Sequence, residues 1–238
     1  MRDDIFKTKK DIVDFKFDKE VVLVFDDMVK RSVPGYEAII QMIGLLTRTY
    51  GQDNSNYYDI GSSTGAVTMS MLLNNKNKNI KFIAIDKSKE MIAEFNKHFA
   101  NKIANIESKC CDVKDISIEN ASIVILNLTL QFIDIKDRDN IINKIYQGMK
   151  PNGVLIVTEK IHSENKQEQE LMTKMHTDFK RENGYDEIEI ANKRQALENI
   201  LQTESCEKHL NRLKRCGFNK NIKYFKCINF VSFLSVKL

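Results

Sequence analysis

The chain has 238 residues, of which 42% are hydrophobic and 29% are charged, and its net charge is +4. This length and composition allow one large domain with a sizeable core and exclude a disordered chain. The basic residues are scattered through loops such as "NNKNKNIK" and are not gathered in one segment, so we expect no direct binding of nucleic acid.

The start of the chain, "MRDDIFKTKK", has no apolar stretch after its charges and does not resemble a signal peptide. The longest apolar runs, such as "VVLVF", are too short to cross a bilayer, so we expect a cytoplasmic protein without membrane contact. Neither the four histidines nor the five cysteines have the spacing of metal ligands, so we expect no bound metal and reduced thiols. The cysteines are Cys110, Cys111, Cys206, Cys216 and Cys227.

The first half of the chain predicts two helix-forming and two strand-forming segments after an N-terminal stretch. Residues 1 to about 50 contain "RSVPGYEAIIQMIGLL", which predicts a turn followed by an amphipathic helix. "YYDIGSSTGAVT" (57–68) predicts the end of a buried strand, a glycine-containing loop and a helix over 66–73. "IKFIAID" predicts a second strand that ends at Asp86, and Ser88 is suited to cap the next helix. The apolar face of that helix consists of Met91, Ile92, Phe95 and Phe99.

The second half continues the alternation. "ASIVILNLTL" predicts another buried strand, and apolar residues at 141, 142, 145 and 149 predict a helix that stops at "KPNG". "VLIVTEK" predicts the following strand, and the closing "IKYFKCINFVSFLSVKL" predicts two more. Strands that alternate with helices indicate an α/β fold with a mostly parallel sheet and helices on both faces.

One polar segment interrupts this pattern. Residues 161 to about 203 are charged and predicted to be helical, and they are far longer than an ordinary connection in an α/β unit. We therefore expect a single domain over 1–238, with an N-terminal helical cap (about 1–50), a Rossmann-like core (about 56–160 and 204–238) and a helical insertion (about 161–203). The insertion is a candidate lid over a substrate, and a solvated decoration or a dimerisation arm explains its composition equally well.

The loop "DIGSSTGA" follows a buried strand and precedes a helix, as nucleotide-binding loops do. Asp86, at the end of the next strand, is suited to accept hydrogen bonds from both hydroxyls of a ribose. The loop alone does not distinguish a ligand site from a plain tight turn. Ser63 and Ala66 stand where the dinucleotide fingerprint requires its second and third glycines, so the loop favours S-adenosylmethionine, which has no phosphate, over NAD.

Three further positions agree with this cofactor. Asp112 ends the third strand, where a carboxylate can accept from the adenine amino group, although it is equally suited to cap a turn. Asn127 ends the fourth strand, at the edge where ligands of open α/β sheets bind. "MKPNGVLIV" resembles the Pro-Gly-Gly turn of class I S-adenosylmethionine-dependent methyltransferases. The site "NLTLQF" lacks the two prolines of enzymes that methylate base amino groups, which disfavours that reaction.

Several longer stretches closely resemble the carboxy-S-adenosyl-L-methionine synthase family. They include "RSVPGYEAIIQMIGLL", "IENASIVILNLTLQF", "INKIYQGMKPNG", "DFKRENGYDEIEIANKRQALEN" and "CGFNK", and they extend from about residue 18 to the end of the chain. The resemblance implies a Rossmann-like, class I methyltransferase-type fold and a homodimer. It also implies that S-adenosylmethionine and prephenate are converted to carboxy-S-adenosylmethionine and phenylpyruvate, with loss of water. The product then supplies a tRNA carboxymethyltransferase that modifies the wobble uridine.

The resemblance also assigns ligand contacts. It places Tyr36 over the sulfonium end and gives Tyr36 and Arg194 catalytic roles, with Arg194 holding the added carboxylate. The remaining contacts are Gly61, Ser62, Ser63 and Asn127 at the methionine part, Asp86 and Lys87 at the ribose and adenine edge, and Asp112 and Val113 at the adenine. The family often has Cys in place of Ser62 and Asn in place of Lys87.

Arg194 suits this role because a planar guanidinium pairs with a carboxylate through two parallel hydrogen bonds. Judged by its neighbours alone, Arg194 resembles an exposed helical arginine, and it is open whether it serves its own subunit or the neighbouring one. Two alternatives to the synthase remain: an ordinary methyltransferase acting on tRNA or a small molecule, and a non-catalytic cofactor-binding partner. Weaker candidates for contact with prephenate, left without assigned roles, are Arg31, Lys160, His176, Arg181 and Tyr185.

Overall fold

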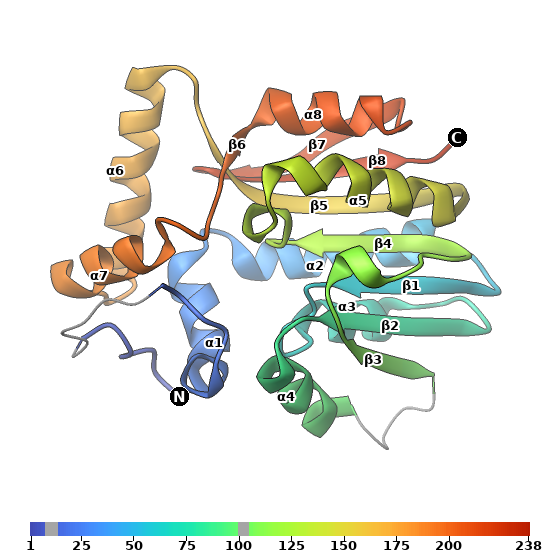
Figure 1. Cartoon of the computed structure of the whole chain (residues 1–238), viewed down its shortest axis with the longest axis horizontal. Helices are drawn as coiled ribbons and strands as arrows, with labels where there is room; N and C mark the ends of the chain where they lie inside the picture. The colour runs from blue at the N-terminus through green and yellow to red at the C-terminus, as the bar shows by residue number, and fades with distance from the viewer. Residues whose placement is uncertain (8–13, 100–104) are drawn as a thin grey trace.

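The structure, a computed structural model, describes residues 1–7, 14–99 and 105–238. Part of the predicted N-terminal cap, residues 8–13, lies outside the described residues. The described strands form a sheet in the order β3-β2-β1-β4-β5-β8-β7 (Figure 1). They are β1 Ser55–Ile60, β2 Ile80–Asp86, β3 Ile106–Cys110, β4 Ala121–Asn127, β5 Met149–His162, β7 Lys220–Cys227 and β8 Phe230–Val236, and the short β6 Glu204–Ser205 pairs with β5.

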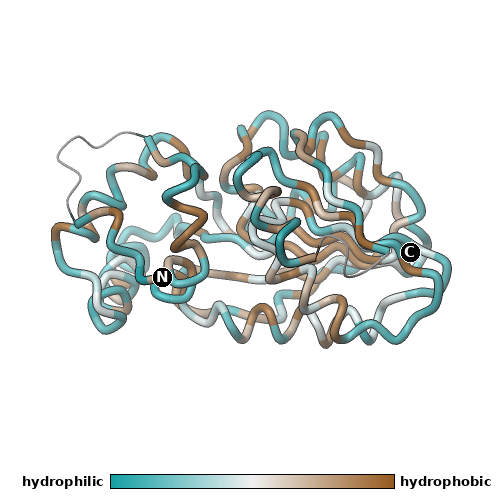
Figure 2. The backbone as a smooth tube through the Cα atoms, turned by 90° about the horizontal axis from the view of Figure 1, so that it is seen from below, coloured by the Kyte–Doolittle hydropathy of each residue, from teal (hydrophilic) through white to brown (hydrophobic). Residues whose placement is uncertain are grey.

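The strands β1 to β5 run parallel, and the two last strands are added antiparallel, β8 against β5 and β7 against β8. Alternate residues of β2 show why both faces are buried: Phe82 and Ala84 face one set of helices, and Ile83 and Ile85 face the other. The apolar strands occupy the centre of the molecule, between more hydrophilic helices (Figure 2). The predicted fold class is confirmed.

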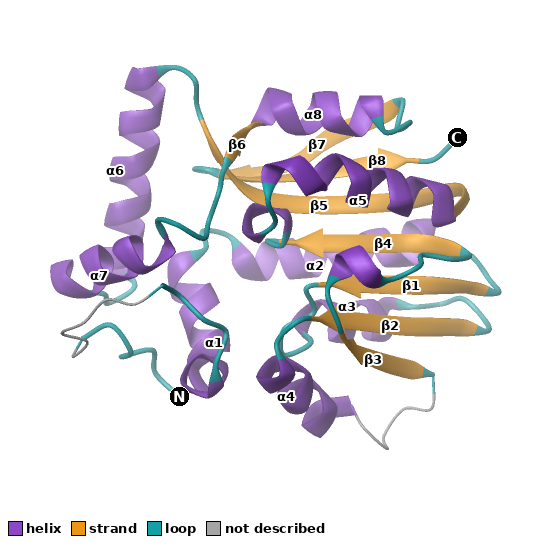
Figure 3. Ribbon diagram, viewed as in Figure 1, coloured by secondary structure: helices purple, strands orange, loops and turns teal. Residues whose placement is uncertain are grey.

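The helices form two layers around the sheet (Figure 3). One face is covered by α2 Tyr36–Tyr50, α3 Ala66–Asn74 and α4 Lys89–Phe99, and the other by α5 Ile135–Gly148 and α8 Cys206–Arg215. Ser88 caps α4 as predicted, because its Oγ accepts from the backbone N–H of Met91 at 3.1 Å. The short 3₁₀ helices η1 Val113–Asp115 and η2 Leu130–Phe132 follow β3 and β4.

Three helices lie beyond the carboxyl ends of the parallel strands: α1 Lys19–Ser32, α6 Lys166–Glu182 and α7 Glu187–Leu197 (Figure 1). Asp18 begins α1 by accepting from the backbone N–H groups of residues 20 and 21. Asp186 and Glu189 form a capping box that begins α7. Residues 166–182 and 187–197 of the predicted insertion are therefore helical, whereas residues 161 and 162 end β5. Among the described residues, every helix is too short or too polar to span a bilayer.

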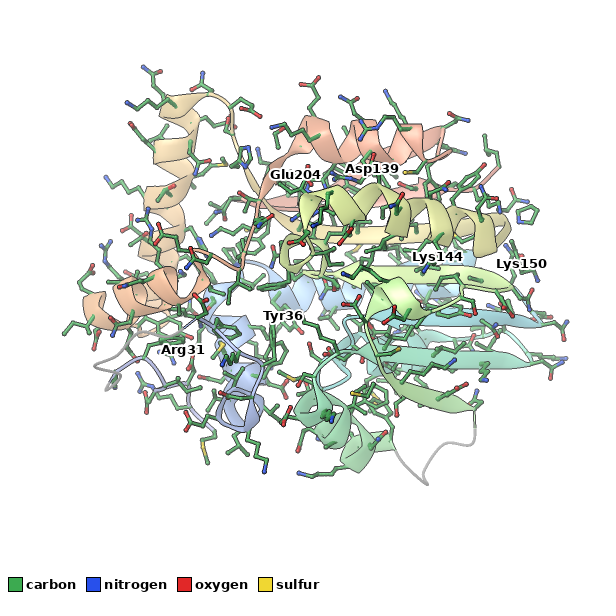
Figure 4. All side chains as sticks on the ribbon, viewed as in Figure 1. Arg31, Tyr36, Asp139, Lys144, Lys150 and Glu204 are labelled. Atoms are coloured by element: carbon green, nitrogen blue, oxygen red, sulfur yellow. The ribbon has the colours of Figure 1, made fainter. Side chains whose placement is uncertain are left out.

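A buried charge network fastens the end of this helical segment to the sheet. Glu204 of β6 accepts from Arg138 of α5 at 2.5 Å and from two nitrogens of Arg212 of α8 at 2.7 and 2.8 Å (Figure 4 labels Glu204). Arg138 also donates to the backbone carbonyl of Gln202 at 2.8 Å. Burial raises the pKa of Glu204, but the bonds and charges of Arg212 and Arg138 outweigh burial and lower that pKa to about 2.

We predict that Glu204→Ala destabilises the fold strongly, because it leaves the fully buried Arg138 guanidinium without its carboxylate. The expected loss in the free energy of unfolding is about 3–5 kcal/mol, measured by urea titration. Glu170→Ala, an exposed change on α6, is the control and should be neutral. Since the native pKa is lowered, the stabilisation is present above about pH 4.5 and is lost as the pH falls towards 2. Equal stability of both variants, or no such acid dependence, would contradict the role of Glu204.

Candidate functional site

A cavity of about 390 Å³ lies at the carboxyl ends of the parallel strands, between the sheet and the helices α1, α6 and α7. Figure 4 shows Tyr36 in this region, between the helical segments and the sheet. Of the predicted site residues, Arg194 does not line the cavity. Those that line it are Tyr36, Gly61, Ser62, Ser63, Asp86, Lys87, Asp112, Val113 and Asn127.

The glycine loop after β1 is held in a conformation that side chains rarely adopt. Gly61 has φ +77°, and a Cβ at this position would lie 2.4 Å from Oγ1 of Thr129. Gly65 has φ +99°, and a Cβ there would meet Phe99 at 2.4 Å. The first glycine therefore allows the loops after β1 and β4 to approach each other, and the second allows α4 to pack. The Oγ of Ser62 is buried without a hydrogen-bond partner among the described residues.

Two carboxylates mark one end of the cavity. Asp86 accepts from the backbone N–H groups of Ser63 and Ser88, both at 2.9 Å, and burial raises its pKa. Asp112 accepts from the backbone N–H of Lys114 at 2.9 Å, so it caps η1, and it also lines the cavity. A carboxylate has about four acceptor positions, so both groups keep capacity for the hydroxyls or amino group of a nucleoside.

The loop after β4 is fixed by a buried acid that the sequence did not reveal. Glu159 of β5 accepts from the backbone N–H groups of Thr129, Leu130 and Gln131 at 3.1, 2.8 and 2.9 Å. Thr129 in turn donates through Oγ1 to the carbonyl of Ile60, at the end of β1, at 2.9 Å. This arrangement fixes the strand end that carries Asn127.

Asn127 and Tyr36 lie at the middle of the cavity wall. The Oδ1 of Asn127 is buried and has no hydrogen-bond partner among the described residues. A buried acceptor without a donor is costly, so a ligand with an N–H group complements it. Tyr36 is the first residue of α2 and follows Gly35, whose φ is +76°. Burial, together with the charges of Asp26 and Asp59, raises the pKa of Tyr36, which keeps the phenol protonated.

The other end of the cavity is lined by lysines from three elements: Lys160 of β5, Lys180 of α6 and Lys193 of α7. His176 lies with them and bonds through Nε2 to the carbonyl of Ser32 at 2.8 Å. Sequence reasoning had singled out Lys160 and His176 and missed the other two lysines. The only signal for Lys193 was its place beside Arg194 in "NKRQ".

Arg194 is exposed on α7, at the rim beside this lysine end, where its charge acts on Lys160 and Lys180. Three other candidates for contact with prephenate, Arg31, Arg181 and Tyr185, have partners within the protein. Arg31 bonds to Asp27 and to backbone carbonyls, and its guanidinium lies 3.9 Å from the ring centre of Tyr185. Arg181 pairs on the surface with Asp178 and Glu187. The described residues hold no group of three or more His, Cys, Asp or Glu side chains suited to a metal ion.

The sheet order, the glycine loop and the cavity at the strand ends define the class I S-adenosylmethionine-dependent methyltransferase fold. Residues 58–153 match the methyltransferase domain family. The fold is similar to that of human N-acetylserotonin methyltransferase in complex with S-adenosylmethionine, with a TM-score of 0.62, 16% identity and coverage of 92% of this chain and 55% of that one.

Relatives of much higher identity define the family more narrowly. The chain is 51% identical to the carboxy-S-adenosyl-L-methionine synthase of Ruthia magnifica subsp. Calyptogena magnifica, covering 100% of both proteins. It is 42% identical to the synthase of Shewanella sediminis, covering 96% of this chain and 95% of that protein. The chain belongs to the carboxy-S-adenosyl-L-methionine synthase family. The predicted family and enzymatic activity are thus confirmed, and the chain belongs to a family that uses S-adenosylmethionine.

We predict that Glu159→Ala lowers the free energy of unfolding by about 3 kcal/mol or more, because three buried N–H groups lose their acceptor. Affinity for S-adenosylmethionine should fall with it, since the loop after β4 forms part of the cavity wall. Glu159→Gln keeps one acceptor oxygen and should lose less of both. Urea unfolding and calorimetric titration measure the two effects. If the alanine variant is as stable and binds as tightly as wild type, Glu159 does not fix the loop.

Proposed function

We propose that the enzyme takes prephenate as its carboxyl donor. Prephenate loses its ring carboxylate as carbon dioxide and its ring hydroxyl as hydroxide to become phenylpyruvate. The methyl group of S-adenosylmethionine loses one proton, which joins the hydroxide to form water, and the methyl carbon then bonds to the carbon of carbon dioxide. The observation that supports this proposal is the charge of the cavity. The acids that line it lie at the end of β2, after β3 and around the start of α5, whereas no carboxylate among the described lining residues comes from the elements that carry Lys160, Lys180 and Lys193. A cationic sulfonium beside several lysines needs an anionic co-substrate.

We propose that S-adenosylmethionine lies with its nucleoside at the acidic end. Asp86 would accept from the ribose hydroxyls and Asp112 from the adenine amino group, with Lys87 and Val113 beside them. The loop Gly61, Ser62 and Ser63 would hold the methionine part, and the unpartnered Oδ1 of Asn127 would accept from its ammonium group. When bound, this substrate supplies a methyl group whose protons are made acidic by the adjacent sulfonium.

The helical segments complete the proposal. We propose that the N-terminal cap and the insertion 161–203 exclude water from the cavity, which strengthens electrostatic interactions inside it. Tyr36 would cover the sulfonium end as a protonated phenol. Arg194 would reach from the rim to the new carboxylate and bind it through two parallel hydrogen bonds. Such a carboxylate also offsets the repulsion between the arginine and the sulfonium.

The proposal also covers the assembly of the enzyme, its location and the use of its product. We propose that it is a homodimer without a bound metal, that it acts in the cytoplasm, and that its product serves a tRNA carboxymethyltransferase that modifies wobble uridine. The enzyme then has no need to bind tRNA itself, in agreement with a net charge of only +4.

We predict that incubation with methyl-labelled S-adenosylmethionine and carboxyl-labelled prephenate gives one nucleoside that carries both labels. Mass spectrometry should find it heavier than its precursor by one carboxyl group, with phenylpyruvate formed in equal amount. Asp86→Ala protein at the same concentration is the control and should form far less. If prephenate stays intact while S-adenosylhomocysteine accumulates, the enzyme is an ordinary methyltransferase and the proposal is wrong.

We predict that Arg194→Ala weakens binding of carboxy-S-adenosylmethionine about 10- to 100-fold, as expected for a lost charge-assisted pair. Binding of S-adenosylmethionine should change little, since it has no added carboxylate. Asp86→Ala should weaken both ligands alike because they share the ribose, and the exposed Arg48→Ala should change neither. Calorimetric titration measures all three. Equal losses for the two ligands in Arg194→Ala would remove the role given to this arginine.

A further inference from the structure

The three lysines at the lysine end of the cavity, Lys160, Lys180 and Lys193, differ in what neutralises their charge. Lys193 Nζ lies 3.2 Å from Oδ2 of Asp3 and donates to Oγ of Ser32 at 2.8 Å and to the hydroxyl of Tyr185 at 3.1 Å. Neither Lys160 nor Lys180 has a hydrogen bond or ion pair at its ammonium group within the described part of the chain. The lysine end thus contains one paired lysine and two lysines whose ammonium groups have no partner among the described residues.

The two unpaired ammonium groups come from consecutive elements, β5 and α6, and both line the same end of the cavity. Burial and the charges of Lys160, Lys193 and Arg194 lower the pKa of Lys180 to about 7. Burial and the charge of Arg194 also lower the pKa of Lys160. Desolvated cations that repel one another are costly unless an anion joins them. Their arrangement therefore suits an anion that comes from a bound ligand, since no acidic side chain among the described residues pairs with them.

The neighbouring His176 adds an uncharged surface. Burial and the nearby lysines lower its pKa to about 3, so the ring is neutral at physiological pH. Its Nε2 bonds to the carbonyl of Ser32 at 2.8 Å, and its ring lies edge-to-face with Phe230, with centroids 5.3 Å apart. Phe230 also lines the cavity. The lysine end therefore combines two free cations with an aromatic surface, which fits a carboxylate carried near an unsaturated ring.

Prephenate has two carboxylates, and only one of them leaves the ring. Loss of carbon dioxide moves negative charge away from the reacting carboxylate, so cations bound to that carboxylate stabilise the ground state more than the transition state and slow the reaction. Cations bound to the other carboxylate fix the substrate without this penalty. A lysine pair is therefore better placed on the carboxylate that does not react.

We propose that Lys160 and Lys180 form a subsite for the 2-oxo acid carboxylate of prephenate, the one that remains on phenylpyruvate. This inference rests on the proposed function, and it separates two anion sites. The exposed Arg194 at the rim receives the transferred carboxylate, and the half-buried lysine pair holds the retained one. Phenylpyruvate keeps the group that the lysines bind, so it occupies the same subsite as prephenate and inhibits competitively.

The test compares phenylpyruvate with phenylacetone, in which a methyl group replaces the carboxylate, by calorimetric titration of enzyme saturated with S-adenosylmethionine at pH 7. Wild type should bind phenylpyruvate much more tightly. Lys160→Met and Lys180→Met should each weaken phenylpyruvate about 10-fold or more, the loss of a charge-assisted bond, and leave phenylacetone unchanged. Lys174→Met, an exposed change on the same helix as Lys180, should behave as wild type.

Equal affinity of wild type and the lysine variants for phenylpyruvate would overturn the subsite. A parallel loss for phenylacetone or for S-adenosylmethionine would overturn it as well, because it would show a general distortion of the cavity. The KM for prephenate should rise in both variants more than kcat falls. Turnover of prephenate by wild type is measured separately. If wild type does not turn over prephenate, the proposed function is wrong. If it does, and the lysine variants bind phenylpyruvate as tightly as wild type, only the subsite is wrong.

Discussion

The carboxylate of Glu159 is the interaction on which the cavity depends. It joins three backbone N–H groups after β4 to the carboxyl-terminal part of β5, and Thr129 extends the connection to the end of β1. Three adjacent strand ends are thereby held at fixed distances, with Gly61 close enough to Thr129 that no side chain fits between them. A site whose walls come from separate strands needs hydrogen bonds that connect its loops, because each loop alone has many accessible conformations.

The cavity is polarised along its length, with acids towards β2 and β3 and three lysines at the other end. Backbone geometry and Asp86 at one end are what any class I nucleoside-binding enzyme requires. Of the lysines at the other end, Lys160 belongs to β5, whereas Lys180 and Lys193 belong to the helical insertion. The common core thus supplies the acidic end, and the added helices supply two of these three lysines. A change of reaction on this fold therefore needs mainly a change in the elements that cover the strand ends.

Local patterns predicted most of the fold, including the strand ends that bring Asp86 and Asn127 to the cavity. The strand β2 was predicted residue for residue, because its apolar run ends where Asp86 begins the crevice. The lysine end was predicted poorly, since Lys180 lies on a polar helix where a buried lysine and a solvated one have the same sequence context. Glu159 was missed for a related reason: "VLIVTEK" indicates a strand, and nothing in it shows that the acid faces backbone donors 30 residues away in sequence. Tertiary contacts of this kind have no local signal.

The partner of Lys193 has a consequence for how the protein is made. Asp3 is fully buried and contacts Tyr185 and Lys193, which lie 182 and 190 residues later in the chain. During synthesis the first residues emerge long before their partners exist, while the strands β1 to β4 already have their own neighbours. The wall around the lysines is therefore among the last parts to assemble. A partly synthesised chain can form the strand ends that carry Asp86 and Asn127, but it cannot yet enclose the lysine end of the cavity.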